Sequence, residues 1–344
     1  MIPYFFFLIT ILLFYWAKKP VWMAVVITVF AVIRFDTGWD YDSYYQACTD
    51  STRLDIAKTA WGWLWGVWFE FCFNHRIPFV GIGVPAILTT AILYRALSLL
   101  YDNDKRKMAD GLLVYSIWPF LYLQSFCIVR QSLAISIMFW AFVLFAQKRY
   151  VLPILLTVLN FFIHPSSVFS VLFIFFIIPP KRLSIGFVIL VSVLSLLTFQ
   201  LLGTVLESLG MLKYLDLLES SDTFGKKIAL LYAALAIYYL FFLSVNKDMS
   251  SIYSKMVPLM ALGCLLQFLV YVTDVPSVIS RACSYTYIFL IPTIFYSFEQ
   301  LKIRTRSLFI VLSCLLFLVY LYITQDSEGA VSQYVPYKTI FSQL

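Results

Sequence analysis

The sequence predicts an all-α integral membrane protein that crosses the bilayer many times. Of its 344 residues, 62% are hydrophobic and only 12% are charged, and the mean hydropathy is +0.88. Soluble domains carry about 25% charged residues, so the chain lacks the polar surface that a soluble enzyme or a disordered protein requires. The net charge of +7 is spread along the chain, so no nucleic-acid partner is expected. Aromatic residues make up 19%, which suits helices with rings at the membrane interfaces.

Apolar segments bounded by polar residues predict about twelve spans, since a simple crossing needs about 20 residues. The first has neither a basic start nor a cleavage site, so we interpret it as a retained span and not as a signal peptide. Short segments beside His164 and Pro165 indicate broken helices around a polar cavity. The predicted spans are 3–17, 20–33, 78–100, 109–123, 131–146, 150–163, 165–178, 183–202, 226–244, 256–273, 281–298 and 307–323.

Lysine and arginine gather in alternate connections, which the positive-inside rule places in the cytoplasm. Both termini then lie outside, with the loops 34–77, 124–130, 203–225 and 274–280 and the tail 324–344. The basic residues of the predicted cytoplasmic connections are Lys18, Lys19, Lys105, Arg106, Lys107, Lys148, Arg149, Lys181, Arg182, Lys247, Lys255, Lys302, Arg304 and Arg306.

The segment 61–73 decides this arrangement. It contains several tryptophans and an embedded Glu70, which favours an interfacial or re-entrant helix. If it crossed the membrane, the basic loop Lys105–Lys107 would lie outside, which the positive-inside rule disfavours. The chain is predicted to form a single transmembrane domain over residues 1–344.

The densest polar patch, residues 34–45, directly follows the second span. A helix starting at Thr37 or Asp40 would place Asp40 and Tyr44 on one face, after a turn at Gly38. Carboxylates can bind sugar hydroxyls or remove a proton, and tyrosines offer a stacking face and a hydroxyl. An ordinary capped loop remains the alternative. The candidates for chemistry in this patch are Arg34, Asp36, Asp40, Tyr41 and Tyr44.

Asp40 and Asp42 imitate a DxD metal-binding motif, but no further acidic or histidine ligand is placed nearby. We therefore expect neither a metal nor another cofactor.

Arg130 and Gln131 begin a helix from the predicted outer side. A guanidinium, an amide and the N–H groups at a helix start suit a phosphate or a diphosphate. Alternatively, Arg130 only extends to the membrane interface.

Three further positions lie on the same predicted side. His164 precedes Pro165 between two short apolar runs, Arg281 begins a late span, and the tail carries Tyr337 and Lys338. Ionisable residues at membrane depth are functional candidates. A packing role for His164 and ion pairs for the cations are the competing explanations. The six cysteines are scattered without a CxxC pair and are expected to be packing residues, although Cys48 lies in a polar stretch.

In its motifs and their order, the chain resembles the EpsG-like branch of the Wzy-type polysaccharide polymerases. Trp39 stands where that family commonly has Thr or Ser. The motifs that carry the resemblance are Arg34…Gly38-Trp-Asp40-Tyr41…Tyr44, Arg130-Gln131-Ser-Leu-Ala134, His164-Pro-Ser, Arg281 and Pro336-Tyr337-Lys338.

The resemblance implies a glycosyltransferase of the bacterial inner membrane, with a GT-C-like helical fold and a polar cavity on the periplasmic side. It would transfer a glycan from undecaprenyl diphosphate to the non-reducing end of a lipid-linked acceptor unit, alongside a chain-length regulator. Arg130, Arg281 and Arg34 would hold the diphosphate, and Asp40 or His164 would deprotonate the acceptor hydroxyl. The remaining substrate-binding candidates are Asp36, Tyr41, Tyr44, Gln131, Tyr337 and Lys338.

Other functions remain open at this point. A flippase or other transporter of lipid-linked oligosaccharides would also hold arginines in a cavity, but we find no internal repeat of the kind that transporters contain. An O-antigen ligase would use the same donor with a different acceptor. A membrane acyltransferase and a purely structural assembly partner explain the outer arginines less well.

Overall fold

The computed structural model describes residues 1–168, 184–194, 223–246, 248–249, 252–273, 277–324 and 334–343. Residues 203–222 of the predicted loop 203–225, most of the span 165–178, part of the span 183–202 and part of the tail lie outside these residues. The predicted cytoplasmic residues Lys181, Arg182 and Lys247 lie outside them as well. The chain divides into two compact units, one formed by Met1–Val168 with Arg304–Leu344 and the other by Phe169–Ile303.

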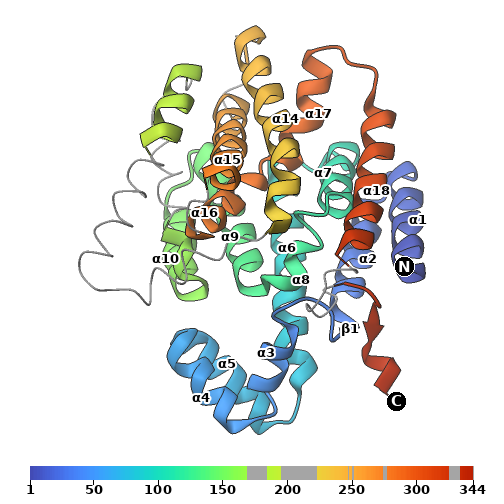
Figure 1. Ribbon diagram of the computed structural model, residues 1–344, viewed down its shortest axis with the longest axis vertical. Coiled ribbons are helices and arrows are strands. Elements are labelled where there is room, and N and C mark those ends of the chain that lie inside the picture. Colours follow the sequence, from blue (N-terminus) through green and yellow to red (C-terminus); the bar gives the residue numbers. More distant parts are fainter. Residues whose placement is uncertain are drawn as a thin grey trace. The chain divides into compact units, whose positions relative to one another are not determined.

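Helices make up nearly all of the first unit (Figure 1). They are α1 (Ile2–Trp16), α2 (Pro20–Val32), α3 (Tyr41–Ala47), α4 (Ser51–Ala60), α5 (Trp63–Asn74), α6 (Pro78–Leu100), α7 (Lys105–Ile117), α8 (Gln124–Cys127), α9 (Val129–Ala146), α10 (Val151–Ile163), the 3-10 turn η1 (Pro165–Ser167) and α18 (Arg306–Ile323). Two short strands, β1 (Arg34–Phe35) and β2 (Lys338–Thr339), pair antiparallel, and the 3-10 turn η2 (Ile340–Gln343) follows.

The second unit contains a helix over 185–194, α14 (Thr223–Val245), α15 (Tyr253–Thr273), α16 (Ser277–Tyr287) and α17 (Leu290–Gln300). Helices α15 and α16 pack closely because Gly263 has no side chain. A Cβ at this position would overlap the Thr286 hydroxyl, a close approach typical of membrane helices. The amide of Gln267 accepts a hydrogen bond from the Tyr287 hydroxyl at 2.8 Å and ties the same two helices together.

Five helices are long and apolar enough to cross a membrane, within the residues that the structure describes: α6, α9, α18 and most of α14 and α15. Shorter apolar helices include α1, α2 and α10. The polytopic helical fold predicted from the sequence is thereby confirmed, and the chain is a multi-pass membrane protein.

Two predicted spans are interrupted. The span 281–298 consists of α16 and α17, separated by a turn at Ile288–Phe289. The span 109–123 ends as a helix at Ile117, because Trp118 precedes a proline and takes an extended ψ of 110°.

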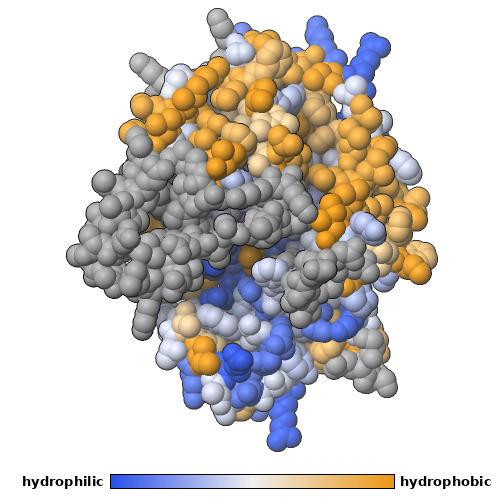
Figure 2. All heavy atoms as spheres, viewed as in Figure 1, coloured by the Kyte–Doolittle hydropathy of each residue, from blue (hydrophilic) through white to orange (hydrophobic). Residues whose placement is uncertain are grey.

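The buried and exposed helices of the first unit differ sharply. Of the residues in α9, 72% are buried within the folded chain, whereas only 17% of the residues in α18 are buried. The outward residues of α18, such as Leu312 and Leu315, are large and apolar. In Figure 2, the side of the view that carries α1 and α18 is mainly hydrophobic, whereas the end formed by α3, α4 and α5 is mainly hydrophilic. Apolar exposure of this kind matches a lipid-facing surface.

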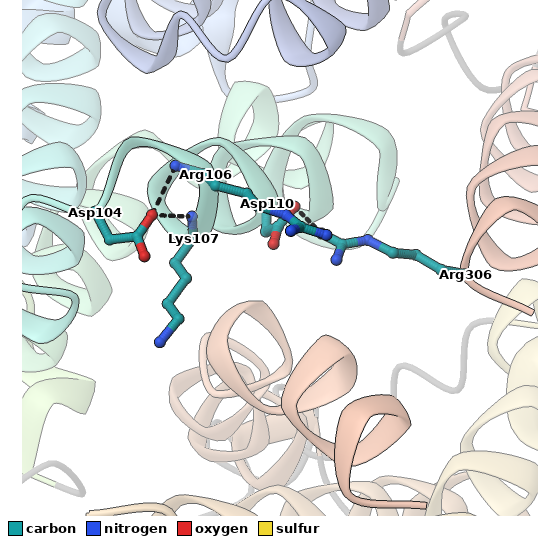
Figure 3. Close-up of polar contacts among 5 residues, drawn as sticks. All are labelled: Asp104, Arg106, Lys107, Asp110 and Arg306. Atoms are coloured by element: carbon teal, nitrogen blue, oxygen red, sulfur yellow. Dashed lines mark hydrogen bonds and ion pairs between the residues drawn. The ribbon is translucent and has the colours of Figure 1, made fainter. Parts of the chain in front are cut away.

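Helix α7 is capped and tied to α18 by acidic side chains (Figure 3). The Asp104 carboxylate accepts hydrogen bonds from the backbone N–H groups of Arg106 and Lys107, at 2.9 and 3.2 Å, and so caps the helix. One turn further on, Asp110 forms an ion pair with Arg306 at the start of α18. This pair joins two connections that the positive-inside rule assigned to the same side.

Contacts at both ends of the first unit agree with the predicted grouping of connections. At one end, the Gln147 side chain donates to the Leu99 carbonyl at 2.9 Å. This bond joins the start of the connection that carries Lys148 to the start of the connection that carries Lys105, and both connections were predicted to lie on the same side. At the other end, the Tyr4 hydroxyl donates to the Tyr334 carbonyl at 2.6 Å. The start of the chain, the tail and the 34–45 patch therefore gather at one end, which we call the predicted outer end.

Candidate active site

The polar patch 34–45 folds against the segment that leads into α9. Gly38 has a φ of 101°, a conformation that glycine adopts without strain. A Cβ at this position would overlap the Phe126 carbonyl oxygen. The predicted glycine turn is therefore correct, and it brings the two polar motifs of the sequence into contact.

Arg130, Tyr44 and Asp40 form a chain of hydrogen bonds. Arg130 Nε donates to the Tyr44 hydroxyl at 3.3 Å, and this hydroxyl donates to Asp40 Oδ2, also at 3.3 Å. Asp40 precedes the first residue of α3, and Tyr44 follows one turn later, as the i, i+4 spacing predicted. A carboxylate is thus linked to a guanidinium through a single phenol.

Tyr44 is neutral in this chain. Its side chain is 3% exposed, and burial raises its pKa to about 12, although the nearby Arg130 guanidinium lowers it. At neutral pH the phenol keeps its proton, so it can accept from Arg130 and donate to Asp40 at the same time.

An aromatic side chain outside the predicted patch fixes Arg130. The guanidinium carbon lies 4.8 Å from the centroid of the Trp61 ring, a cation–π distance. The Trp61 ring also meets Tyr44 edge-on at 5.1 Å. Sequence reasoning assigned the tryptophans of this region to the membrane interface and did not identify Trp61. Its place beside Arg130 depends on long-range packing and leaves no local signal.

Arg34, which the sequence placed at the outer end of the second predicted span, is buried. It is 2% exposed, Nη1 donates to the Ala31 carbonyl at 2.9 Å, and the guanidinium lies 4.5 Å from the Phe126 ring centroid. Among the described residues, its Nε and Nη2 have no hydrogen-bond partner. The Tyr41 hydroxyl, close enough to interact with the arginine charge, also lacks a partner there. Unsatisfied buried donors of this kind are costly, so they identify a place where an anion or water would be bound.

The tail completes the predicted outer end. Lys338 Nζ lies 2.5 Å from Asp36 Oδ2, and Thr339 pairs with Arg34 in the β ladder. The Tyr337 ring stacks on Phe30 at 4.2 Å, and its hydroxyl donates to the Phe30 carbonyl. The structure therefore brings Asp36 and the tail residues together, in contacts that anchor the tail.

The other predicted site residues are placed as follows. His164 is half-buried, caps η1 and has its Nδ1 at 2.6 Å from the Ser166 hydroxyl, while η1 packs against α9. Gln131 is 3% exposed. Arg281 belongs to the second unit, where its side chain is exposed on α16.

Two further observations concern possible ligand sites. No group of three or more His, Cys, Asp or Glu side chains suited to a metal occurs among the described residues. The small cavity between α2, α6, α7 and α8 holds only about 10 Å³, and its lining includes Thr89, Thr90, Tyr115, Tyr122 and Ser125. That volume accommodates about one water, so this cavity is not a substrate site.

Comparison with known proteins places this arrangement in a family. No curated protein and no solved structure matches the chain. A sequence model of the EpsG family matches residues 19–339, which include both polar motifs and the anchored tail. The chain therefore belongs to the EpsG family, a family of Wzy-like polysaccharide polymerases.

Proposed function

We propose that the protein is a glycosyltransferase that polymerises oligosaccharide units linked to undecaprenyl diphosphate. Membership of the EpsG family supports a polysaccharide polymerase-type membrane protein. The observation that carries the finer proposal is the hydrogen-bonded chain from Arg130 through Tyr44 to Asp40. It lies at the predicted outer end of the first unit, so the reaction would occur at the outer face of the bacterial inner membrane.

The proposed reaction needs one base and one anion-binding group. The bond between the donor's anomeric carbon and a phosphate oxygen breaks, and the anomeric carbon bonds to an acceptor hydroxyl oxygen. The hydroxyl proton goes to a base, and negative charge builds up on the departing lipid diphosphate. Preorganised donors at that charge usually provide the largest catalytic effect.

Arg130 and Asp40 suit these two tasks. The hydrogen bond to Tyr44 uses Nε of Arg130, and the edge formed by Nη1 and Nη2 can bind two phosphate oxygens. Trp61 holds the guanidinium plane. Asp40 would accept the acceptor's proton while Tyr44 orients its carboxylate. Arg34 and Arg281 are proposed as further cations for the diphosphate, and His164 as the alternative base.

Replacement of Arg130 by lysine tests this assignment. Arg130→Lys keeps the charge but loses the planar fork, so we expect polymerisation from synthetic undecaprenyl diphosphate units to fall at least tenfold. Arg53→Lys, at an exposed position of α4, is the matched control and should retain the wild-type rate. Undiminished chain growth by Arg130→Lys would remove Arg130 from the site. Absence of any glycan ladder with a cognate substrate would refute the polymerase function itself, and a chelator arm tests the expected independence of metals.

A further inference from the structure

Arg34 carries a buried charge for which the described residues supply no counter-charge. Its side chain is 2% exposed, and only Nη1 has a hydrogen-bond partner there, the Ala31 carbonyl at 2.9 Å. No ion pair joins Arg34 to a carboxylate in the described part of the chain. Arginine stays protonated in proteins, and a buried charge without a partner is strongly unfavourable. A water could accept a hydrogen bond here but would leave the charge unbalanced, so the charge calls for an anionic group.

The two unpartnered nitrogens of Arg34 lie on one edge of the guanidinium. The N–H of Nε and one N–H of Nη2 point the same way from that edge, so together they can bind a single acceptor. The Phe126 ring, with its centroid 4.5 Å from the guanidinium carbon, covers one face and leaves the edge free. The buried Tyr41 hydroxyl also lacks a partner among the described residues. Its ring packs edge-on against Phe35, the residue after Arg34, at 5.6 Å.

The acidic side chains that follow Arg34 in the sequence have other partners. Asp36 Oδ2 lies 2.5 Å from Lys338 Nζ, and both side chains are exposed, at 41% and 45%. Asp40 and Asp42 each accept a hydrogen bond from a side chain one turn further along α3. None of these carboxylates pairs with Arg34, which favours a bound ion as the source of the missing negative charge.

The covering tail limits the size of that ion. Thr339 pairs with Arg34 in the β ladder, and the Ile340 N–H donates to the Ile33 carbonyl at 2.9 Å. The small cavity lined by Ala31, whose carbonyl accepts from Arg34, holds about 10 Å³, the space of about one water. We propose that Arg34 binds one small monovalent inorganic anion, of the size of chloride, as its counter-ion in the folded protein.

The bound anion would stabilise the start of the polar patch. Its charge balances the guanidinium, so the tail can close over Arg34 without burying an unpaired cation. Gly38 and α3 (Tyr41–Ala47) follow Arg34 within the same patch, so the ion would help to hold the segment that carries Asp40. This site does not depend on the proposed function, in which a lipid diphosphate could use Arg34 only after the tail and the small anion had been displaced.

Exchange of anions around the purified full-length protein tests the proposal. The protein is dialysed in detergent into gluconate, which is too large for the site, and chloride is then added at constant ionic strength. We expect the melting temperature to rise with chloride and to reach a plateau, because a ligand that binds only the folded state stabilises it. Equilibrium dialysis with radioactive chloride should give one bound ion per chain. Inorganic phosphate, the probe for a phosphate site, should give no such rise.

Variants assign the ion to Arg34. Arg34→Gln removes the charge and the free edge, so we expect no bound chloride and no chloride-dependent melting. Arg34→Lys keeps the charge but loses the edge with two donors, and its affinity for chloride should fall at least tenfold. Arg53→Gln, at an exposed position of α4, is the matched control and should bind chloride as the wild type does.

Three results would overturn the proposal. They are chloride-independent melting of the wild type without a bound ion, an equal chloride response in Arg34→Gln, and stabilisation by phosphate in place of chloride. If neither variant folds, bromide exchanged into wild-type crystals and located by its anomalous scattering decides the question. A bromide at the Nε–Nη2 edge supports the site, and its absence from Arg34 refutes it. None of these measurements uses a glycan substrate, so they can fail or succeed separately from polymerisation.

Discussion

Replacing Tyr44 by phenylalanine removes the single hydroxyl that links Arg130 to Asp40. The ring would still stack on Phe69 and meet Trp61, so we expect the fold to be retained. The two lost hydrogen bonds each involve a charged partner, for which about 1.5–3 kcal/mol is typical. Both measure 3.3 Å, which is longer than the usual range, so the lower values apply.

At about 1.5 kcal/mol for each bond, the loss of transition-state stabilisation is about 1.5 kcal/mol if one bond contributes to catalysis and about 3 kcal/mol if both do. These losses correspond to a roughly 10- to 150-fold lower rate. The assay is the initial rate of chain growth by purified protein with synthetic lipid-linked units, with thermal melting to verify folding. Tyr45→Phe is the control. Tyr45 lies on the same helix and stacks on Tyr41 at 6.2 Å, and its hydroxyl makes no hydrogen bond within the described part of the chain.

Two outcomes would refute this reasoning. Chain growth by Tyr44→Phe within twofold of the wild-type rate would show that the phenol does not position the charged groups. A Tyr44→Phe loss that persists undiminished in an Asp40→Asn background would show that Tyr44 does not act through Asp40, because coupled residues give non-additive losses.

Three further predictions concern stability. Folding raises the pKa of Tyr44 from 10 to about 12, so its contribution to the free energy of unfolding is complete below pH 10 and is lost as pH rises through 12. Raising the pH through this range should therefore lower the melting temperature of the wild-type protein more than that of Tyr44→Phe. Gly38→Ala adds a methyl group that would overlap the Phe126 carbonyl, at a residue with a positive φ. We expect the free energy of unfolding to fall by about 1–3 kcal/mol, measured as a lower melting temperature. An unchanged melting temperature would contradict the described turn. Asp110→Asn removes the buried carboxylate that pairs with the half-buried Arg306 and should cost about 1.5–3 kcal/mol, the range for a hydrogen bond to a charged group. If the Asp110→Asn, Arg306→Gln double variant melts no higher than this single variant, the ion-pair explanation is wrong.

Local periodicity predicted the parts of the site that lie within one helix turn. The pairing of Asp40 with Tyr44 follows from their spacing, and the turn at Gly38 follows from the freedom of glycine, so both could be read from the sequence. The grouping of connections into two sides followed from lysine and arginine, and the Asp110–Arg306 ion pair agrees with it.

Contacts between distant segments could not be predicted in this way. The contacts of Trp61 with Arg130 and of Phe126 with Arg34 depend on how the end of α4 and α8 pack, and apolar periodicity gives no information about such partners. The burial of Arg34 could not be predicted for a related reason. Its position after a span places it at a helix end, but the sequence does not show that the tail covers it through the pairing of β1 with β2.

The anchored tail has a consequence for synthesis of the protein. Tyr4 and Tyr334 are joined by a hydrogen bond across 330 residues of sequence, and Lys338 holds Asp36 beside the candidate site. The ribosome completes every predicted span before it supplies these residues. A nascent or prematurely terminated chain that lacks the tail would therefore reside in the membrane with Arg34 uncovered, and only chains that include the tail would gain the β1–β2 pairing and the Lys338–Asp36 ion pair.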